Sequence, residues 1–283
     1  MYLTEQHDDA RALVRDTDEC ASLAFEACQL AGGVLMRYWQ ALNEADVREK
    51  SKGDLVTSAD LEAERVVSEF LLREMPEAGI VCEEGTARAG NGLVWFLDPL
   101  DGTTNFVQRF PAFAVSLGLA RLRDAAAPEL LCGVVFNPLS GQLFWGAKDK
   151  GAFLGTQRLS VARKEKLSEA MLATGFPRRY HDELPAFLRE FALIFPRCRA
   201  IRRAGSAALD LCWTAQGIFD GFWEHKLSPW DIAAGALIVQ EAGGVCSDFM
   251  GDDAFLNSGN IVGAAPVIHQ HILACIAEAR QQG

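Results

Sequence analysis

Apolar residues recur at helical spacing in two stretches near the start of the chain. Within each stretch they lie three or four positions apart, which places them on one face of a helix. The first stretch contains Leu23, Ala27, Leu30 and Val34, and the second contains Ala63, Val66, Val67, Phe70 and Leu71. The second pattern stops at Met75-Pro76, because proline cannot continue a helix. The sequence therefore predicts two amphipathic helices at the start of the fold.

The pattern then changes to short apolar runs that are separated by Gly, Pro and Asn. Runs of this length between turn residues are typical of β-strands, and their close spacing favours a largely antiparallel sheet. The runs are Gly79–Cys82, Leu93–Leu97, Phe113–Ala120, Leu131–Phe136 and Gln142–Ala147. We therefore expect a sheet between about residues 79 and 155.

Helical patterns return after Arg163, with short strand-like pieces between them. The predicted helices are Glu183–Phe195, Ser206–Ala215, Pro229–Ala242 and Pro266–Ala279. Helices and strands that are segregated along a chain in this way indicate an α+β layered sandwich.

No repeat, low-complexity tract or Gly/Ser/Pro linker divides the chain into independent units. We therefore predict a single domain over residues 1–283, with two closely packed α/β lobes at about 1–155 and 156–283. The first fifteen residues are predicted to form a flexible tail.

Composition narrows the classes of function. The chain has 283 residues, of which 49% are hydrophobic, and a formal net charge of −11. This charge argues against nucleic acid as the principal ligand, because phosphate backbones are bound by surplus Lys and Arg. If so acidic a protein handles a phosphate, we expect metal ions to mediate the contact.

The chain also lacks signals for export or for metal binding by sulfur. It has no run of eighteen apolar residues and no basic, apolar leader, so we expect a cytoplasmic protein without a membrane span. The eight cysteines form no CxxC pair, which predicts neither a disulfide framework nor a zinc site. His269 and His271 are interpreted as surface residues.

Two acidic residues follow the predicted strand Leu93–Leu97 in the stretch DPLDGTTNF. Pro99 ends the strand, so Asp98 and Asp101 can converge at its exit. An ordinary Asx-type turn would explain the Asp-Gly pair alone. The following Gly-Thr-Thr, however, offers backbone N–H groups and hydroxyls at the entry to a short helix, where a phosphate can bind. Carboxylates that face such a cradle need a cation between them, and oxygen ligands favour Mg²⁺, with Mn²⁺ second.

Three further acidic segments each allow a structural and a functional interpretation. Glu83 and Glu84 follow the apolar pair Ile80-Val81 at another strand end, or belong to a charged loop. Ser228-Pro-Trp-Asp231 has the form of a capping box, so Asp231 can cap a helix. Asp60 precedes the second predicted helix and can be its N-cap. Spacing alone does not decide among these interpretations.

In order, these four segments resemble the motifs of the inositol monophosphatase family. WFLDPLDGTTNF is similar to the first metal motif, SPWDIAAG to the second, VCEEG to the Glu-Glu motif, and KGDLVTSAD to the segment with a catalytic Asp. Further similarity lies in FPAFAVSLGLA, ATGFP, RRAGSAALDLC and GFWE. The resemblance runs from about residue 20 to the C-terminus. It implies an αβαβα sandwich, a homodimer and a lithium-sensitive phosphoric monoester hydrolase with two to three Mg²⁺ ions.

The resemblance also implies a role for individual residues. One Mg²⁺ would be held by Glu83, Asp98 and the carbonyl of Leu100, a second by Asp98, Asp101 and Asp231, and a weaker third by Glu83 and water. Asp60 and Thr103, with Glu83, would be catalytic by polarising the nucleophilic water. Phosphate would be bound by Gly102, Thr103 and Thr104. The substrate hydroxyls would contact Asp101, Gly205, Ser206, Ala207 and Glu224.

These assignments imply hydrolysis by direct attack of a metal-activated water on a small phosphomonoester. The acids of the first motif are three apart, whereas those of aspartyl-phosphate enzymes are two apart, which favours a mechanism without a phosphoenzyme. The expected substrate is myo-inositol 1-phosphate. The alternatives are a fructose-1,6-bisphosphatase or broad sugar phosphatase and, from another class, a regulatory binding partner of the transcription machinery. The retention of Asp60, Glu83 and Asp231 favours catalysis.

Overall fold

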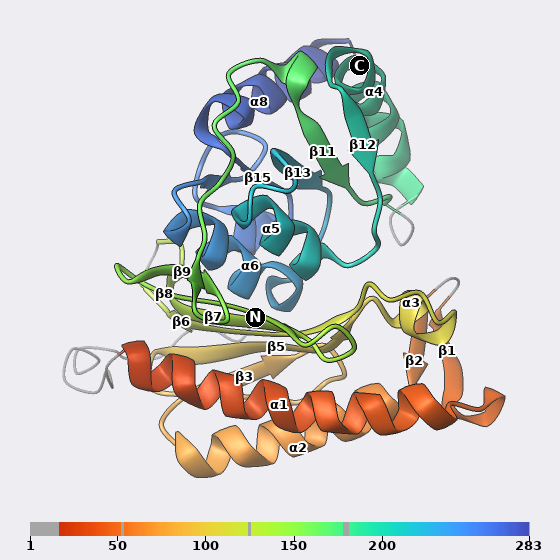
Figure 1. The fold of residues 1–283 in the computed structure, drawn as a ribbon, viewed down its shortest axis with the longest axis vertical. Coiled ribbons are helices and arrows are strands. Elements are labelled where there is room, and N and C mark those ends of the chain that lie inside the picture. The colour runs from red at the N-terminus through yellow and green to blue at the C-terminus, as the bar shows by residue number, and fades with distance from the viewer. Residues whose placement is uncertain (1–16, 52–53, 124–125, 178–180, 283) are drawn as a thin grey trace.

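The computed structural model describes residues 17–51, 54–123, 126–177 and 181–282. Its elements stack in five layers that alternate between helices and sheets (Figure 1). The predicted αβαβα sandwich is therefore confirmed. The expected flexible tail at residues 1–15 lies outside the described residues.

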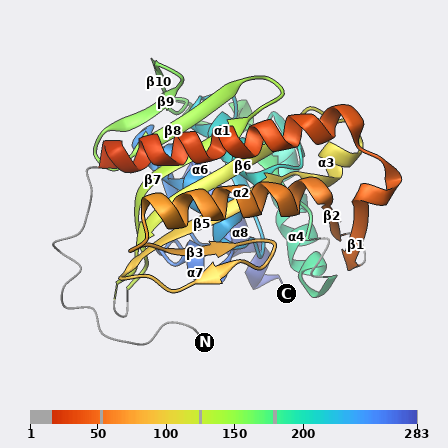
Figure 2. The same ribbon diagram turned by 90° about the horizontal axis from the view of Figure 1, so that it is seen from below.

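The first layer consists of two long helices, α1 (Thr17–Ala41) and α2 (Ser58–Glu74). They run side by side across one face of the first sheet (Figure 2). Each buries a stripe of small and apolar residues, as the helical spacing predicts. Leu30 is an exception, because it was predicted on the apolar face of α1 and is 43% exposed. A hairpin of β1 (Val47–Ser51) and β2 (Asp54–Thr57), which the apolar pattern did not predict, joins the two helices by way of the short helix η1 (Glu44–Asp46).

The second layer is an eight-stranded sheet in the order β10-β9-β8-β7-β6-β5-β3-β4. All of its pairs are antiparallel except β3 with β5, so the expectation of a largely antiparallel sheet is confirmed. Its strands are β3 (Gly79–Cys82), β4 (Ala87–Arg88), β5 (Leu93–Asp101), β6 (Ala114–Arg121), β7 (Glu129–Asn137), β8 (Gln142–Ala147), β9 (Gly151–Leu154) and β10 (Gln157–Arg158). Every residue of β5 is buried, because helices cover both faces of the sheet.

The middle layer contains α5 (Ala207–Ala215) and α6 (Pro229–Glu241), which lie between the two sheets (Figure 1). Helix α6 approaches the first sheet closely where β6 and β7 carry glycine. A Cβ atom at Gly133 would lie 2.7 Å from the Cα of Ala234, and one at Gly118 would lie 2.9 Å from the Ala234 nitrogen. The two glycines therefore let the apolar helix pack directly on the sheet backbone.

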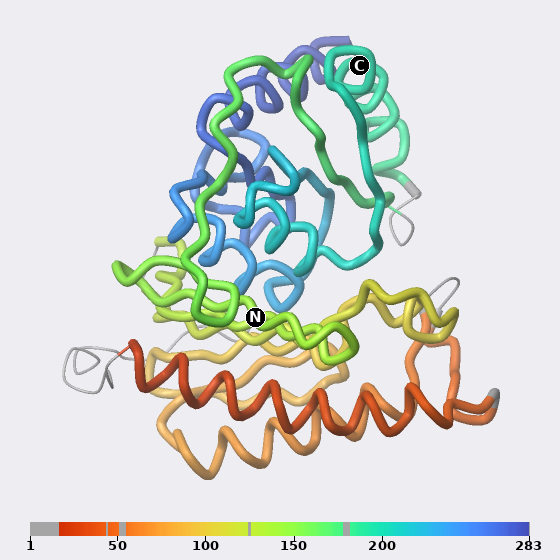
Figure 3. Tube along the Cα trace, in the orientation of Figure 1, coloured from red at the N-terminus to blue at the C-terminus, as the bar shows by residue number. Residues whose placement is uncertain are grey.

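Beyond this layer lie a second sheet, in the order β12-β11-β13-β15-β14, and two outer helices. Residues 159–170 carry the chain from the first sheet to the second (Figure 3). The strands are β11 (Met171–Thr174), β12 (Ala200–Arg202), β13 (Gly221–Glu224), β14 (Val245–Ser247) and β15 (Ile261–Ala264), and the outer helices are α4 (Leu184–Ile194) and α8 (Pro266–Gln281). The short helices are α3 (Thr103–Val107), α7 (Phe255–Ser258), η2 (Leu167–Glu169), η3 (His181–Glu183) and η4 (Phe195–Arg197).

Burial tests the interpretation of His269 and His271 as surface residues, and His271 is exposed as predicted. His269 is buried and its Nε2 lies 2.9 Å from Ser247 Oγ, so its interpretation as a surface residue is wrong. The sequence pattern did not reveal that α8 packs against the second sheet with His269 on its inner side. No disulfide joins the cysteines, as expected. None of the helices in the described part of the chain has the length and apolar content needed to span a membrane. The single domain and its division into two lobes stay predictions.

Candidate active site

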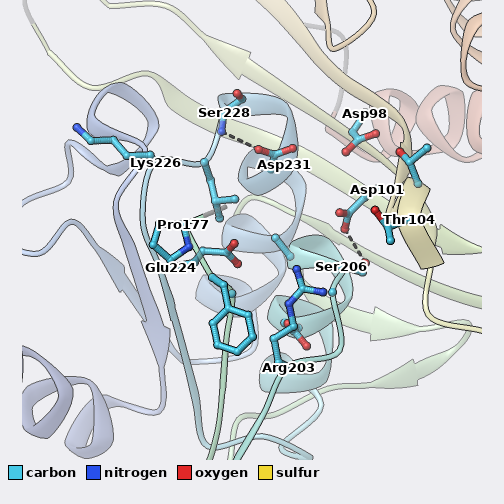
Figure 4. Close-up of a pocket in the computed structure, with 18 of the residues that line it drawn as sticks. Asp98, Asp101, Thr104, Pro177, Arg203, Ser206, Glu224, Lys226, Ser228 and Asp231 are labelled. Carbon is cyan, nitrogen blue, oxygen red and sulfur yellow. Dashed lines mark hydrogen bonds between the residues drawn. The ribbon is translucent and has the colours of Figure 1, made fainter. Parts of the chain in front are cut away.

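A pocket of about 180 Å³ lies where the C-terminal end of β5 meets the first turns of α5 and α6. It is lined by every residue predicted to hold metal, phosphate or substrate. These residues are Glu83, Asp98, Leu100, Asp101, Gly102, Thr103, Thr104, Gly205, Ser206, Ala207, Glu224 and Asp231. Figure 4 shows the carboxylates of Asp98, Asp101 and Asp231 directed toward one another across this pocket. Segments far apart in the sequence therefore deliver their acidic side chains to one place.

The backbone of β5 places Asp98 and Asp101 on the pocket side. Pairing with β6 is regular as far as Asp98 and becomes irregular before Asp101, where Pro99 interrupts the ladder. Asp98 Oδ1 accepts a 2.9 Å hydrogen bond from the Leu100 nitrogen. Asp101 Oδ2 accepts bonds from Ser206 Oγ (2.6 Å) and the Ala208 nitrogen (2.8 Å) at the start of α5. Both carboxylates are thus held by the protein.

Glu83 enters from the neighbouring parallel strand. Strand β3 pairs with β5, and the Glu83 nitrogen continues that ladder with a 3.1 Å bond to the Leu97 carbonyl. The next residue, Glu84, is fixed by a 2.7 Å bond from its nitrogen to buried Glu64. Lys50 Nζ lies 2.5 Å from Glu84 Oε1 and 3.8 Å from Glu83 Oε1. Of the two interpretations of this segment, the structure supports the strand end, and Glu83 lines the pocket there.

Asp231 and Asp60 each take part in the capping of a helix, as the third helical residue of a capping box. Ser228 is the N-cap of α6, and its nitrogen donates a 2.7 Å bond to Asp231 Oδ2, which confirms the capping box. Asp60 is not the N-cap of α2, because Thr57 occupies that position and Asp60 is the third helical residue. Asp60 Oδ2 accepts bonds from the Thr57 nitrogen (2.9 Å) and Oγ1 (2.5 Å). For Asp231 the capping and functional interpretations are compatible, because a capping carboxylate has a second oxygen left for another ligand.

Burial and mutual repulsion raise the pKa values of the buried acids. The pKa of Asp98 lies well above its usual value, because the side chain is buried and because Glu83, Asp101 and Asp231 repel its charge. Burial raises the pKa of Asp101 to about 6, against the hydrogen bonds from Ser206 and Ala208, which lower it. A cluster of this kind is costly to ionise unless positive charge enters the pocket.

Asp60 lies next to this cluster, fully buried and outside the pocket lining. Burial raises its pKa to about 7, although the bonds from Thr57 oppose the shift. Its Oδ1 lies 3.3 Å from Thr103 Oγ1, and that hydroxyl lies 3.1 Å from the Leu100 carbonyl oxygen. Asp60 therefore reaches the pocket through the hydroxyl of Thr103.

The donor set suits a hard cation. Four carboxylates and the Leu100 residue surround the pocket without sulfur or imidazole among the predicted ligands, which is the chemistry that Mg²⁺ prefers. Among the residues that the structure describes, no three His, Cys, Asp or Glu side chains converge tightly enough to form a metal-binding group as they stand. The residues therefore have the ligand atoms that Mg²⁺ prefers. Their side chains would have to move closer together to bind the ion.

The turn after Asp101 has the backbone geometry that the predicted anion cradle requires. Gly102 has a φ of 91°, in the left-handed region that favours glycine, and a Cβ atom there would lie 2.8 Å from the Ala112 carbonyl oxygen. Thr103 and Thr104 begin α3 directly after it, so their backbone N–H groups have no partner within the helix. Asn105 Nδ2 donates to the carbonyls of Ala112 (2.6 Å) and Ala204 (2.9 Å), which ties this turn to the segment before α5.

The opposite wall of the pocket comes from the second sheet and from α5. Glu224 ends β13, and its carboxylate occupies the space beside Gly175, where a Cβ atom would lie 1.9 Å from it. Burial raises the pKa of Glu224 to about 8, while Arg203 lowers it and Asp101 raises it. Gly205 has a φ of 88°, and Ser206 is the N-cap of α5.

Other residues that line the pocket were not predicted to belong to the site, and Arg203, Asp210 and His225 are among them. Arg203 and Asp210 both belong to the segment RRAGSAALDLC. Asp210 lies between two leucines of an apolar predicted helix, and this position was the available sign that the acid has a function. His225 directly follows Glu224, and its Nε2 lies 2.7 Å from Glu190 Oε2 on α4.

Comparison with known proteins agrees with this geometry. The model of the Inositol monophosphatase family matches residues 16–283. A Caulobacter vibrioides protein named inositol-1-monophosphatase is 39% identical over 252 residues, which cover 88% of this chain and 97% of the relative. A Vibrio cholerae protein named Nus factor SuhB is 38% identical over 257 residues, which cover 89% of this chain and 94% of the relative.

The fold is also found among solved structures. The inositol monophosphatase from Anabaena superposes with a TM-score of 0.81 at 34% sequence identity, covering 92% of this chain and 96% of the other. The family match spans nearly the whole chain and includes all the segments that build the pocket. This protein therefore belongs to the inositol monophosphatase family.

Proposed function

We propose that the chain is a Mg²⁺-dependent phosphatase of small polyol phosphomonoesters, with myo-inositol 1-phosphate as the preferred substrate. The observation that carries the proposal is the meeting of Glu83, Asp98, Asp101 and Asp231 in one pocket beside the cradle of Gly102. The Caulobacter relative supports the choice of substrate by its name. Two to three ions, lithium inhibition, a homodimer and a cytoplasmic location belong to the same proposal.

The acidic residues would bind the metal. Glu83, Asp98 and the Leu100 carbonyl would hold one ion, and Asp98, Asp101 and Asp231 would hold another. When bound, Mg²⁺ neutralises phosphoryl oxygens and lowers the pKa of a coordinated water. Ser206 and Ala208 already hold Asp101 from one side, and Ser228 holds Asp231, so the ligands are partly oriented by the protein itself.

The cradle and the Asp60–Thr103 pair would act on the phosphate and on the water. Gly102, Thr103 and Thr104 line the pocket, and their backbone N–H groups would donate to phosphoryl oxygens. The Thr103 hydroxyl can accept a proton from the attacking water as it passes its own to Asp60 Oδ1, 3.3 Å away. A carboxyl with a pKa of about 7 is well matched to accept that proton near neutral pH.

The test is phosphate release from a panel of phosphomonoesters. The purified protein would be assayed with myo-inositol 1-phosphate, fructose 1,6-bisphosphate and glycerol phosphate, each with Mg²⁺ and with EDTA. We expect Mg²⁺-dependent release that is fastest from myo-inositol 1-phosphate and inhibited by LiCl. Fastest release from fructose 1,6-bisphosphate would select the sugar-phosphatase alternative. Absence of release from every substrate would refute the proposal.

A regulatory role in transcription is the second candidate, because the Vibrio relative is named a Nus factor. The two roles can be separated with Asp98→Asn, which removes a proposed metal ligand. A purely regulatory protein would bind its partners in the transcription machinery equally well with this substitution and would release no phosphate in either form.

A further inference from the structure

Asp210 is a buried acid that faces the pocket and has no role in the mechanism above. It lies in the first turn of α5, is 1% exposed and lines the pocket wall. Its Oδ1 is buried and has no hydrogen-bond partner. An unpaired buried carboxyl oxygen destabilises a protein, so its position next to the pocket needs an explanation.

Stability does not supply that explanation. An acid in the first turn of a helix interacts favourably with the helix dipole, and this interaction contributes about 0.3–1 kcal/mol at typical exposed sites. That gain is smaller than the cost of removing an unpaired polar group from water. The neighbouring charges do not compensate either, because Glu224 and Asp101 repel an ionised Asp210 and raise its pKa, as does burial itself. Only Arg203 among the causes of the shift acts in the opposite direction.

Arg203 also lines this pocket, although its side chain is exposed. Its guanidinium carbon lies 5.7 Å from the ring centre of Phe176, and a Cβ atom at Gly205 would lie 2.4 Å from one guanidinium nitrogen. Figure 4 shows the Arg203 side chain extending into the pocket beside Ser206 and Glu224. The absence of a Cβ atom at Gly205 therefore leaves room for the guanidinium inside the pocket.

We propose that Asp210 and Arg203 form, with Glu224, a subsite that binds the hydroxyl groups of the substrate. Asp210 Oδ1 accepts a hydrogen bond from one hydroxyl, and the guanidinium of Arg203 donates to the oxygen of a neighbouring one. This inference rests on the proposed phosphatase function and narrows its substrate class. Because two carboxyl groups, those of Asp210 and Glu224, lie near the single guanidinium of Arg203, the subsite favours an uncharged polyol over a second phosphate group.

The test compares two substrates that share a phosphate ester and differ in hydroxyl groups, myo-inositol 1-phosphate and phenyl phosphate. For Asp210→Ala we expect the KM for myo-inositol 1-phosphate to rise about tenfold, the effect of losing one hydrogen bond. The value of kcat should change little, and the KM for phenyl phosphate by less than about twofold. Asp210→Asn, which keeps an acceptor oxygen, should recover part of the lost affinity.

Two further variants separate binding from a general effect on α5. Thr214→Val alters a buried residue one turn further along the same helix, outside the pocket lining, and should leave the ratio of the two KM values unchanged. Arg203→Gln changes an exposed side chain, so it tests the subsite even if Asp210→Ala does not fold. It should also raise the KM for myo-inositol 1-phosphate selectively.

The outcomes distinguish this inference from the proposed function. If wild type hydrolyses both substrates but Asp210→Ala and Arg203→Gln leave the KM ratio unchanged, the subsite is refuted while the phosphatase stands. Equal increases in both KM values would also refute it. If wild type hydrolyses neither substrate in the presence of Mg²⁺, the phosphatase proposal fails, and the subsite fails with it.

Discussion

Ser206 Oγ donates a 2.6 Å hydrogen bond to Asp101 Oδ2, although the two residues are 105 positions apart in the chain. The bond joins the end of a strand in the first sheet to the N-cap of a helix in the middle layer. It also joins the proposed metal side of the pocket to the proposed substrate side. The two walls of the pocket are therefore fixed to each other by a side chain that contributes to both.

Ser206→Ala should weaken both the helix and the site. The substitution removes the cap that accepts from the Leu209 nitrogen and the bond to Asp101, at a cost of about 1–2 kcal/mol in the free energy of unfolding. Because this bond lowers the pKa of Asp101, its loss raises that pKa further. We expect the pH at which Mg²⁺-dependent activity reaches half its maximum to move upward. An unchanged pH profile would show that Asp101 does not govern it.

Asp60→Asn should change the pH dependence of stability in metal-free protein. An Asp that titrates at about 7 in the folded chain and near 3.8 when unfolded keeps its proton longer in the folded state. Its contribution to the free energy of unfolding is therefore greatest below pH 4 and is lost as the pH rises through 7. When the pH is raised from 5 to 8 in EDTA, the free energy of unfolding measured by urea denaturation should fall less for Asp60→Asn than for wild type.

The same variant should lower the rate of hydrolysis by about a hundredfold or more, because general-base assistance is of that size. Full activity in Asp60→Asn would remove Asp60 from the proton path through Thr103.

Gly102→Ala should destabilise the cradle by more than the left-handed backbone conformation at residue 102 alone would cause. The control is Gly141→Ala, which has a similarly positive φ of 71° but no atom within 4 Å of the added Cβ. Gly141→Ala should lose about 1–2 kcal/mol from the left-handed backbone alone. Gly102→Ala meets the Ala112 carbonyl as well and should lose more stability together with phosphate affinity. Equal effects of the two substitutions would contradict a tightly packed cradle.

The buried pair of His225 and Glu190 connects α4 to the strand end that carries Glu224. The two side chains are 2.7 Å apart and almost fully buried. Glu190→Ala leaves the imidazole nitrogen without this partner and should cost about 1–3 kcal/mol in thermal or urea unfolding. Glu69→Ala, at an exposed Arg65 pair on α2, is the control and should change stability by less than about 0.5 kcal/mol. A cost as small as that of the control would show that the pair does not anchor α4.

The sequence predicted those parts of the fold that depend on local periodicity. The spacing of Ala63, Val67 and Leu71 corresponds to the buried face of α2, and Pro99 marked the break at the end of β5. The capping box at Ser228 was also predictable, because it depends on two residues three positions apart. Local chemistry of this kind is determined before the chain packs.

Sheet order and the wall of the pocket opposite the acids could not be predicted in this way. The parallel pairing of β3 with β5, which brings Glu83 beside Asp98, depends on long-range packing. Glu224 repels the charge of Asp210 only because α5 packs near β13, so the sequence neighbours of the two residues do not reveal this interaction. The motif resemblance named the acids that meet in the pocket, whereas the places of Arg203 and Asp210 in its wall emerged only from the structure.

Isothermal titration of Mg²⁺ into metal-free wild type and Asp98→Asn tests the central claim most directly, because it measures the cation without relying on a substrate. Asp98 faces Glu83, Asp101 and Asp231, so it should be the ligand whose charge matters most. At pH 8 we predict saturable Mg²⁺ binding by wild type, weaker binding at pH 6, where protons compete for Asp101, and at least tenfold weaker binding by Asp98→Asn at either pH. Equal Mg²⁺ binding by the two proteins, or none by wild type, would contradict the account.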